Sequence, residues 1–393
     1  MPGNVACKTC TSQGRLRERI SATLPRIFLV GGGHAQLAVL ADWIRHGRPR
    51  SEAWLVNPGR FLRYSGMIPG IISGDYHADD GLIDLPALAS VAGVGFIEQA
   101  LVTLDLVERH IVLDDGLALP FDYCSIDVGG VGQAAAILGS DQRLLDIRPI
   151  DRFLPQLSAR IIPSPSAKTH FAVIGGGAGG VEIAFALRNA SGLATTVEVR
   201  LITGKQGLLP DQGAMARKIA AQEMRRQNIV VDCRDARVVG GKLYADAELV
   251  EPIDHIIAAI GNAAPAWPTQ SGLAVDNDGF IVVDRYQRSI SHPFILATGD
   301  VAARQDQAVP HSGVHAVHAG PILAANLRSI LAGNEPSKSY TPRRSSLYLL
   351  STGRRSAILV YGRFSALNSW TWWLKRWIDK RWVSAYCQLT ERM

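Results

Sequence analysis

Apolar residues in this chain fall in short runs that end at glycine, a pattern that predicts buried parallel strands followed by tight turns. The first run, 27–30, leads into three glycines and then into a helical pattern from Ala35 onwards. Strand, glycine turn and helix in this order form a βαβ unit whose helix N-terminus offers N–H groups to a phosphate. Gln36 replaces the third glycine of GxGxxG, so this turn by itself is an imperfect nucleotide motif.

The same pattern returns 144 positions later with the motif complete. Gly175, Gly177 and Gly180 stand between an apolar run and a helical pattern. A second strand is expected after each turn, at 53–56 and at 197–202. We therefore predict an α/β fold with two Rossmann-like units, both able to bind a dinucleotide.

The acidic residue that usually follows the second strand and binds the ribose hydroxyls is missing from both units. Asn57 stands there in the first unit, and Thr203 stands there in the second. Lys205, two positions further on, could pair with the 2′-phosphate of NADPH or could be a solvated loop lysine. The sequence therefore leaves the choice between NADH and NADPH open.

Several other segments carry a recognisable pattern. Residues 61–76 are apolar and rich in glycine, so we expect them to pack on a ligand or on a neighbouring domain. Two further strands end in glycine, one within FDYCSIDVGG (121–130) and one within FILATGD (294–300). A helix is expected over 311–332, and two strand-like runs follow near Leu347 and Ile358.

The expected helix over 311–332 carries His311, His315 and His318 on one face. These side chains could relay protons to an electron acceptor, or they could pack and cap the helix. A metal site is a weaker alternative, and we expect none. A CxxC at Cys7 and Cys10 is at most half a zinc site, because no second pair completes it.

The net charge of +6 is concentrated at the two ends of the chain. Residues 1–26 hold five basic residues against one acid, and residues 363–393 hold six against two, which leaves −2 for the body. A nucleic-acid-binding protein needs a basic face on its folded body, so this distribution argues against nucleic acid. It suits an anionic membrane surface.

The last helical pattern, from Leu367, contains five of the eight tryptophans of the chain. Apolar residues recur there at helical spacing, and charged residues are expected on the opposite face. The apolar set is Trp370, Trp373, Leu374, Trp377, Ile378 and Trp382, and the charged set is Lys375, Arg376, Asp379 and Lys380. A basic amphipathic helix with tryptophans is typical of a membrane surface. The alternative is that the apolar face packs on the protein body or on a second copy in a homodimer.

No run of 18 apolar residues is present, and the N-terminus has no apolar signal segment. We therefore expect no spanning helix and a cytoplasmic protein, with peripheral binding to the inner face of the cytoplasmic membrane as a further possibility. The number of cysteines, five, is odd, and apart from Cys7 and Cys10 they are widely spaced, which fits reduced thiols.

Two glycine turns, the FDYCSIDVGG strand between them and FILATGD after the second together resemble the two-dinucleotide-binding flavoproteins of the pyridine nucleotide-disulfide oxidoreductase superfamily. Among these flavoproteins, the chain resembles the type II NADH:quinone dehydrogenases. GGGHAQLAVL, YSGMIPG and SIDVGG are also similar to the flavoprotein module that can be fused to selenide, water dikinase. The resemblance implies FAD on the first unit and NAD(P)H on the second, inserted unit.

The resemblance also implies a division of the chain. The expected parts of the chain are a flexible basic tail (1–25), an FAD-binding domain (26–145 and 278–345), an NAD(P)H-binding domain (146–277) and a C-terminal interface or membrane-surface segment (346–393). The last segment holds a strand pair and the amphipathic helix.

Site residues follow from the resemblance in the same way. Around FAD they are Gly31, Gly33, His34, Ala35, Asn57, Leu101, Gly129, Gly299, Asp300, Gly313 and Val314. Around NAD(P)H they are Gly175, Gly177, Ala178, Gly180, Lys205 and Gly261. Glu182 is expected beside nicotinamide and flavin, and His315 is expected on the path to the acceptor; both are candidate catalytic residues.

The chain departs from some relatives in its cysteines. It lacks the CxxxxC of disulfide reductases, and Cys124 and Cys233 lie in different units, unlike the cysteine pair of sulfide:quinone reductases. The expected activity is therefore transfer of electrons from NAD(P)H through FAD to a quinone-like acceptor. A slow flavoprotein for sensing or partner binding, and a partner in selenium or sulfur metabolism, are the alternatives.

Overall fold

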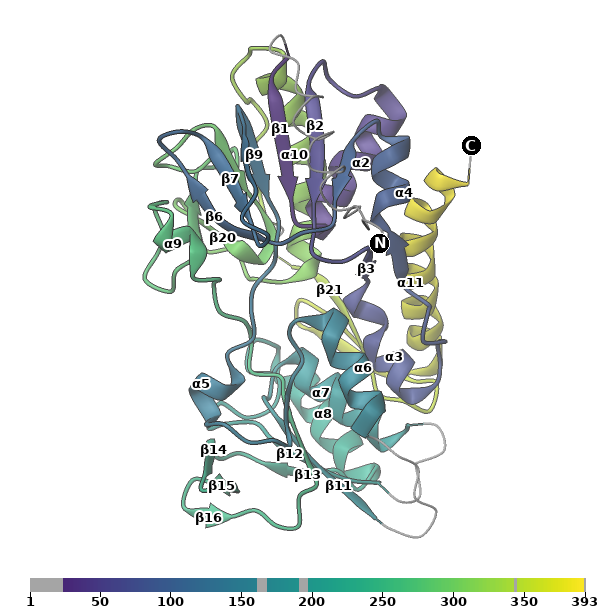
Figure 1. Cartoon of the computed structure of the whole chain (residues 1–393). Helices are drawn as coiled ribbons and strands as arrows, with labels where there is room; N and C mark the ends of the chain where they lie inside the picture. The colour runs from purple at the N-terminus through teal and green to yellow at the C-terminus, as the bar shows by residue number, and fades with distance from the viewer. Residues whose placement is uncertain (1–23, 161–167, 191–196, 343–344, 392–393) are drawn as a thin grey trace, which may run out of the picture.

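The protein is described by a computed structural model over residues 24–160, 168–190, 197–342 and 345–391. Two five-stranded parallel sheets form its two halves (Figure 1). The first sheet contains, in spatial order, β19 (Ile295–Ala297), β9 (Tyr123–Ile126), β1 (Arg26–Val30), β2 (Glu52–Val56) and β5 (Gly95–Ile97). The second contains β10 (Leu144–Asp146), β17 (His255–Ala258), β11 (Thr169–Ile174), β12 (Val197–Ile202) and β13 (Val230–Asp232). The second sheet is inserted in sequence between β9 and β19 of the first, which confirms the predicted fold class.

Alternating residues of β1 face two separate cores, as expected for a fully buried strand. Ile27 and Leu29 pack against helices, whereas Phe28 and Val30 pack against a small antiparallel sheet. The helices are α2 (His34–His46), α4 (Leu85–Val91) and α10 (Gly313–Leu331). The small sheet is β6 (Leu101–Asp105), β7 (His110–Leu113) and β8 (Ala118–Pro120), flanked by the pair β18 (Ile281–Val283) and β20 (Ala302–Arg304) and by α9 (Trp267–Gln270).

The second half repeats this layering. Phe171 and Val173 of β11 face helices, and Ala172 and Ile174 face another antiparallel sheet. The helices are α6 (Ile150–Arg160), α7 (Ala178–Arg188) and α8 (Ala214–Arg226), and the sheet is β14 (Ala236–Val239), β15 (Lys242–Ala245) and β16 (Glu248–Leu249), next to α5 (Ala134–Leu138). Both glycine turns therefore lie at the carboxyl ends of central parallel strands, where such sheets bind ligands.

The apolar segment 61–76 connects the two halves. It forms β3 (Phe61–Arg63), paired with β4 (Leu82–Asp84), and then η1 (Ser65–Met67) and α3 (Ile68–Ser73). Ile68, Ile71 and Ile72 of α3 join the core of the second half. The expected packing on a neighbouring domain is thus confirmed.

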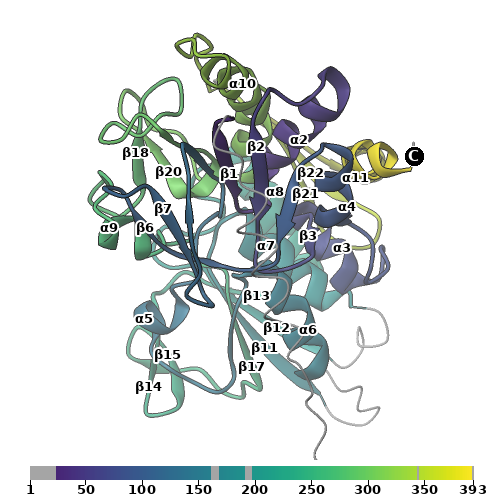
Figure 2. The ribbon, with the colours of Figure 1, turned by 45° about the horizontal axis from the view of Figure 1, so that its top comes forward.

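The C-terminal segment holds three antiparallel strands rather than the expected pair: β21 (Leu347–Ser351), β22 (Ala357–Tyr361) and β23 (Phe364–Asn368). Helix α11 (Ser369–Thr390) follows and runs along the side of both halves (Figures 1 and 2). No helix among the described residues is both long enough and apolar enough to cross a bilayer.

The prediction that all four charged residues of α11 face solvent is wrong for two of them. Lys375 and Asp379, expected on the solvent face, are buried against the body, with side chains 11% and 4% exposed. Trp370, Trp373 and Trp377 are more than half exposed. Two of the four charged side chains thus find partners beneath the helix, and three tryptophans of the predicted apolar set lie on its outer side.

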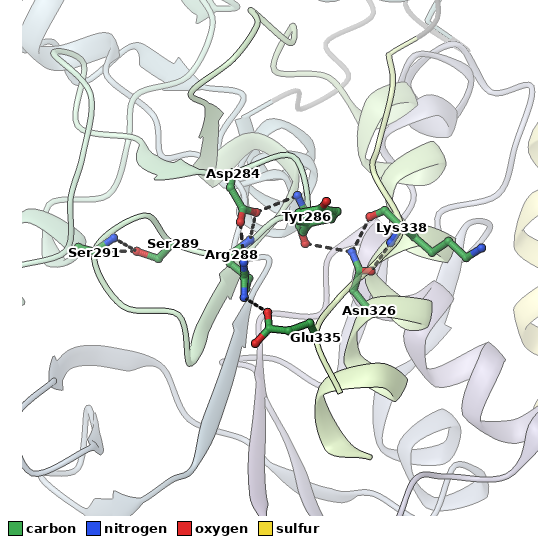
Figure 3. Close-up of polar contacts among 8 residues, drawn as sticks. All are labelled: Asp284, Tyr286, Arg288, Ser289, Ser291, Asn326, Glu335 and Lys338. Atoms are coloured by element: carbon green, nitrogen blue, oxygen red, sulfur yellow. Dashed lines mark hydrogen bonds and ion pairs between the residues drawn. The ribbon is translucent and has the colours of Figure 1, made fainter. Parts of the chain in front are cut away.

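Helix α10 begins at Gly313, so His311 lies before it and the expected row of three histidines on one helix is wrong. After α10 the chain is pinned to the 284–291 region, as Figure 3 shows. The side chain of Asn326 donates to the carbonyl oxygens of Tyr286 and Lys338, and Arg288 pairs with Glu335. These contacts fix the segment that carries Tyr340 beneath the start of α10.

Candidate functional site

The first glycine turn has the geometry of a phosphate-binding turn. Gly31 has φ of +89°, and a Cβ there would lie 2.4 Å from the carbonyl oxygen of Asp127, so glycine is required. The N–H groups of Gly33 and His34 at the start of α2 have no intrahelical acceptor. They are free to meet a pyrophosphate, so this turn fits the group.

A buried carboxylate that the sequence analysis did not select, Asp127, lies at the same helix start. Its Oδ2 accepts hydrogen bonds from the N–H groups of Ala35 and Gln36 at 2.8 and 3.1 Å. Burial raises the pKa of Asp127 to about 7, although both N–H donors favour the charged form. The N–H of Ala35, expected to bind the cofactor, is therefore already engaged. The sequence signal was a single acid at the end of an apolar strand.

Gln36 replaces the third glycine by making its own contacts. Its Nε2 donates to the carbonyl oxygen and to Oγ of Ser125 on β9, at 2.8 and 2.9 Å. The close approach that glycine normally allows occurs elsewhere, because a Cβ on Gly320 of α10 would lie 2.6 Å from Cβ of Ala38 on α2. The side chain that replaces the third glycine is thus held on β9 by two hydrogen bonds, and Gly320 lets α10 pack closely on α2.

Asn57 holds the turn itself. Its Oδ1 accepts from the N–H of Gly32 at 2.8 Å, and its Nδ2 donates to the carbonyl of Gly59 at 2.6 Å. Gly129 has φ of +69° and open space where a Cβ would be, on the loop that follows β9. Leu101 is half-buried on β6 and packs on the core between the first sheet and β6–β8. Asn57 and the loop of Gly129 are therefore at the turn, and Leu101 is part of the adjoining sheet.

Gly299 and Asp300 follow β19 within η2 (Gly299–Val301). The carboxylate of Asp300 pairs with Nη2 of Arg148 at 3.0 Å. Arg148 lies between β10 and α6 in the second half, so this ion pair joins the two halves. A Cβ on Gly299 would lie 2.4 Å from Oδ1 of Asp127, which places Asp300 beside the first glycine turn.

The N-terminus of α10 also lies beside the first glycine turn. Ser312 at the N-cap makes no capping hydrogen bond through its side chain, so the first N–H groups, from Gly313 and half-buried Val314, keep their donors and the positive end of the dipole. A Cβ on Gly313 would lie 3.7 Å from Cε1 of His34. Burial lowers the pKa of His34 to about 4, so its imidazole is neutral at pH 7. This corner can stabilise a ligand group that becomes negative.

The second glycine turn is tighter. Gly175 has φ of +123°, and a Cβ there would lie 2.2 Å from the carbonyl oxygen of Ala259. A Cβ on Gly180 would lie 1.9 Å from the carbonyl oxygen of Gly175. Gly177 at the N-cap offers no side chain, so the first N–H groups of α7, beginning with Ala178, are available to a second pyrophosphate.

Two further expected residues lie at the rim of this second turn. Gly261, just after β17, has φ of +91° and open space where a Cβ would be. Lys205 is 73% exposed and pairs with Asp235 at 3.2 Å. The space beside Gly261 and the surface position of the Lys205–Asp235 ion pair leave room for a nucleotide at this rim.

Glu182 forms part of a buried ionic cluster that reaches α11. Its Oε1 accepts from the N–H of Ser351 at 2.8 Å and lies 3.6 Å from Nζ of Lys375. The same Nζ lies 3.6 Å from Oδ2 of Asp379 and donates to the carbonyl of Gly66 at 3.1 Å. Burial raises the pKa of Glu182 and of Asp379; for Lys375 burial acts downward, but the two carboxylates outweigh it and raise the pKa.

Tyr64 and Tyr76 from the 61–76 segment complete this cluster. The hydroxyl of Tyr76 donates to Oδ2 of Asp379 at 3.3 Å, and Tyr64 is also hydrogen-bonded to Asp379. Burial and the carboxylate of Asp379 raise the pKa of both phenols, which therefore stay protonated. Trp382 of α11 stacks on Tyr64 at 4.5 Å between ring centroids and lies 5.0 Å from the ring of His34. The cluster thus extends from α7 to the first glycine turn.

His315 is buried on α10, away from this cluster. Its Nδ1 lies 2.8 Å from the hydroxyl of Tyr340, and burial lowers its pKa, so the imidazole is neutral at pH 7. It lines a small pocket of about 40 Å³ together with Thr298, whose Oγ1 has no partner in the described part of the chain. Within those residues no contact joins His315 to Glu182, so the two candidate catalytic residues are held by different partners.

A cleft of about 770 Å³ lies at the amino ends of the strands of the first sheet, opposite the glycine turn. It is lined by Arg26 at the start of β1, by Tyr123 at the start of β9 and by Phe294 before β19. Ligands of parallel sheets bind at the carboxyl ends of strands, so this cleft is not the nucleotide site.

The three described cysteines are free thiols on separate elements. Cys124 is buried on β9, Cys233 is exposed after β13, and Cys387 is on α11. Burial raises the pKa of the Cys124 thiol, which disfavours a reactive thiolate. The CxxC at Cys7 and Cys10 lies outside the described residues.

Residues 25–320 match the family model described as pyridine nucleotide-disulphide oxidoreductase. Among curated proteins, ferroptosis suppressor protein 1 of Xenopus laevis is 25% identical over 284 residues, which is 67% of this chain and 70% of that protein.

Among solved structures, the sulfide:quinone oxidoreductase of Aquifex aeolicus superposes with a TM-score of 0.76 at 15% identity, over 93% of this chain and 92% of that one. NDH2 of Plasmodium falciparum superposes with a TM-score of 0.72 at 15% identity, over 93% and 98%. These structures share the fold. Because the family model covers both glycine turns and the Gly299-Asp300 strand end, the chain belongs to the pyridine nucleotide-disulphide oxidoreductase family.

Proposed function

We propose that this protein is an FAD-dependent NAD(P)H dehydrogenase that passes a hydride from nicotinamide C4 to flavin N5 and then delivers electrons to a quinone-like acceptor. Family membership makes the chain an NAD(P)H-dependent flavoprotein oxidoreductase. One observation carries the finer proposal: the two glycine-turn halves are joined by the Asp300–Arg148 ion pair directly beside the first turn. Two dinucleotides extending from the two turns would therefore meet at this junction.

The first half would hold FAD. The N–H groups of Gly33 and His34 would bind the pyrophosphate, Asp300 would accept from the ribityl chain, and the start of α10 at Gly313 would face the pyrimidine ring. The helix dipole at this N-terminus would stabilise negative charge on that ring. The flavin supplies the redox chemistry, and the chain supplies position and electrostatics.

The second half would hold NAD(P)H. The N–H groups of Ala178 and Gly179 would bind the second pyrophosphate, and the backbone at Gly261 would leave space for the nicotinamide. Glu182, in the second turn of α7, would lie near the reacting rings. Its link to Lys375 keeps an ammonium beside a carboxylate, and this pair can hold a proton for an acceptor that takes up both electrons and protons.

Anaerobic titration of the flavin-loaded protein tests the proposal. We expect NADH or NADPH to bleach the flavin absorbance near 450 nm within seconds, because the nicotinamide nucleotide and FAD would meet at the same junction. Addition of a soluble quinone should then restore the absorbance. No bleaching by either nucleotide would contradict the dehydrogenase proposal, and bleaching without reoxidation by any quinone would contradict the acceptor.

We propose that α11 brings the acceptor to the protein by resting on a lipid surface. Trp370, Trp373 and Trp377 are exposed by 56%, 58% and 58% and recur at helical spacing. Arg381 lies over the ring of Trp377 at 5.3 Å, and exposed Lys380 adds a second cation beside the aromatic stripe. Exposed tryptophans next to cations match an anionic membrane interface. The buried face of the same helix carries Lys375. The ionic cluster of Glu182, Lys375 and Asp379, which would hold the proton for the acceptor, therefore lies directly beneath the tryptophan stripe.

Replacing all three tryptophans of this stripe with serine should reduce binding to anionic lipid vesicles by roughly 10-fold or more, because the apolar area that would enter the interface is lost. Co-sedimentation with vesicles checks this, with flavin content as the measure of folding. The control is Trp372→Phe, a buried neighbour on the same helix, which should bind vesicles as the wild type does. If the stripe instead holds a homodimer together, the triple variant should bind vesicles as the wild type does, and its molecular mass in solution should fall from that of a dimer to that of a monomer.

A further inference from the structure

The second half lacks a carboxylate after β12, but a neighbouring loop places one there. In a Rossmann unit an acidic residue at this point accepts hydrogen bonds from the adenosine ribose. Thr203 occupies the position, and its hydroxyl lies within hydrogen-bonding distance of the carbonyl oxygens of Gly204 and Asp232, at 3.0 and 3.3 Å. The side chain is therefore turned toward the backbone, and Thr203 cannot replace the acid.

The loop after β13 lies directly beside this point because β13 is the next strand in the sheet. The N–H of Thr203 donates to the carbonyl of Asp232 at 2.8 Å, and the N–H of Gly204 donates to the carbonyl of Arg234 at 3.1 Å. Asp235 follows, and its Oδ1 accepts from the N–H of Lys205 at 3.3 Å. A Cβ on Gly204 would lie 3.4 Å from this same oxygen. A carboxylate thus stands at the ribose position, supplied by another strand.

The loop that carries Lys205 is held down on the glycine turn. The N–H of Leu209 donates to the carbonyl of Gly176 at 2.7 Å, and a Cβ on Gly176 would lie 2.2 Å from the carbonyl oxygen of Gly207. A dinucleotide lying on the turn would therefore have its adenosine ribose next to Gly204. The side chain of Asp235 is 59% exposed, so a ligand can reach it.

The cations near this point already have carboxylate partners. Lys205 pairs with Asp235 at 3.2 Å. Arg234 makes a two-bond contact with Asp232, at 2.7 and 2.6 Å, and a further ion pair with Glu248. The 2′-phosphate of NADPH would therefore meet no unpaired cation at Lys205 or Arg234, and it would be repelled by the carboxylate of Asp235. The 2′-hydroxyl of NADH could instead donate a hydrogen bond to that carboxylate.

We propose that Asp235, from the loop after β13, replaces the missing acid after β12, binds the adenosine ribose hydroxyls and makes NADH the preferred reductant over NADPH. This inference rests on the proposed function, because it assumes that the second glycine turn binds the nicotinamide dinucleotide. It assigns to this turn a specificity that its own sequence motif does not carry.

Binding of NAD⁺ and NADP⁺ to the flavin-loaded protein, measured by calorimetry, tests the inference alongside anaerobic bleaching by NADH and NADPH. We expect wild type to favour NAD⁺. Asp235→Asn should lower this preference by roughly 10- to 100-fold, the range for a hydrogen bond to a charged group. Lys205→Ala should leave NAD⁺ binding within about 3-fold, because an exposed ion pair contributes little.

Each outcome decides between the possibilities. Equal affinity for the two nucleotides in wild type, or an unchanged ratio in Asp235→Asn, overturns the inference while bleaching still supports the dehydrogenase. A selective loss of NADP⁺ binding in Lys205→Ala, with NADP⁺ the tighter ligand in wild type, assigns the site to a 2′-phosphate and also overturns it. Absence of both binding and bleaching overturns the proposed function as well.

Discussion

Replacing Lys375 with methionine should lower the free energy of unfolding by about 3–5 kcal/mol near pH 7.5, the usual cost of removing one partner from a buried ion pair. The ammonium of Lys375 lies 3.6 Å from both Glu182 and Asp379, and the three side chains are between 4% and 14% exposed. Without the ammonium, two carboxylates face each other in a site closed to water. Chemical denaturation monitored by tryptophan fluorescence measures the loss, because α11 carries most of the tryptophans.

The defect in Lys375→Met should depend on pH. Burial already raises the pKa of Glu182 and Asp379, and loss of the ammonium raises both further. A carboxyl whose pKa is raised in the folded state contributes its stability at low pH and loses it as the pH rises through that folded pKa. The variant should therefore come closest to wild type near pH 5 and fall furthest behind near pH 8.

Lys380→Met is the matched control, since Lys380 is an exposed lysine on the same helix. It should change stability by no more than about 0.5 kcal/mol at any pH. Adding Glu182→Gln to Lys375→Met should recover part of the loss, because one of the two opposed carboxylates is removed. Equal stability of the two methionine variants would contradict the buried cluster.

Replacing Gly180 with alanine should slow the reduction of the flavin by NAD(P)H by roughly 100-fold or more, while the protein still binds FAD. The new Cβ would lie 1.9 Å from the carbonyl oxygen of Gly175, so α7 must move away from the turn that it supports. Overpacking of this kind costs about 1–3 kcal/mol and displaces the N–H groups that would bind the second pyrophosphate. Stopped-flow bleaching gives the rate, and the flavin absorbance of the purified protein gives the FAD content.

Gly179 provides the control one residue away. A Cβ there would lie 4.0 Å from its nearest neighbour, Cδ1 of Ile147, so Gly179→Ala should leave the free energy of unfolding within about 0.5 kcal/mol. If Gly180→Ala matched Gly179→Ala in stability and the wild type in bleaching rate, close packing of α7 on the second turn would not be needed for the reaction.

The two glycine turns show how far a local motif can be trusted. The second one keeps all three glycines, and the structure gives each a steric or phosphate-facing reason. The first one has Gln36, and the sequence alone counted this against nucleotide binding. Its buried amide bonds Ser125 on the neighbouring strand, and Gly320 on a distant helix supplies the close approach. Gln36 is therefore accommodated by residues that no local pattern connects to it.

Several site residues could not have been found from the sequence. Asp127 is separated from the first turn by 91 to 92 residues and reaches it only because β9 is the strand next to β1. Asp235 reaches the ribose position because β13 is next to β12. Asp127 lies within the SIDVGG segment and Asp235 lies outside every quoted motif, but neither lies beside its glycine turn in the sequence, so strand order had to be known before either could be assigned.

The sequence by itself determined the two glycine turns and the strands that precede them, because these depend on local periodicity and on backbone positions that only glycine can occupy. The inserted order of the halves followed from the family resemblance that the combined motifs carry. Only the tertiary structure decided which face of α11 is buried. A helical pattern places Trp373 and Lys375 on different faces but cannot say which face meets the body. That choice depends on Glu182, Gly66 and Tyr76, which lie elsewhere in the sequence and together give a buried ammonium and a buried carboxylate the partners they need.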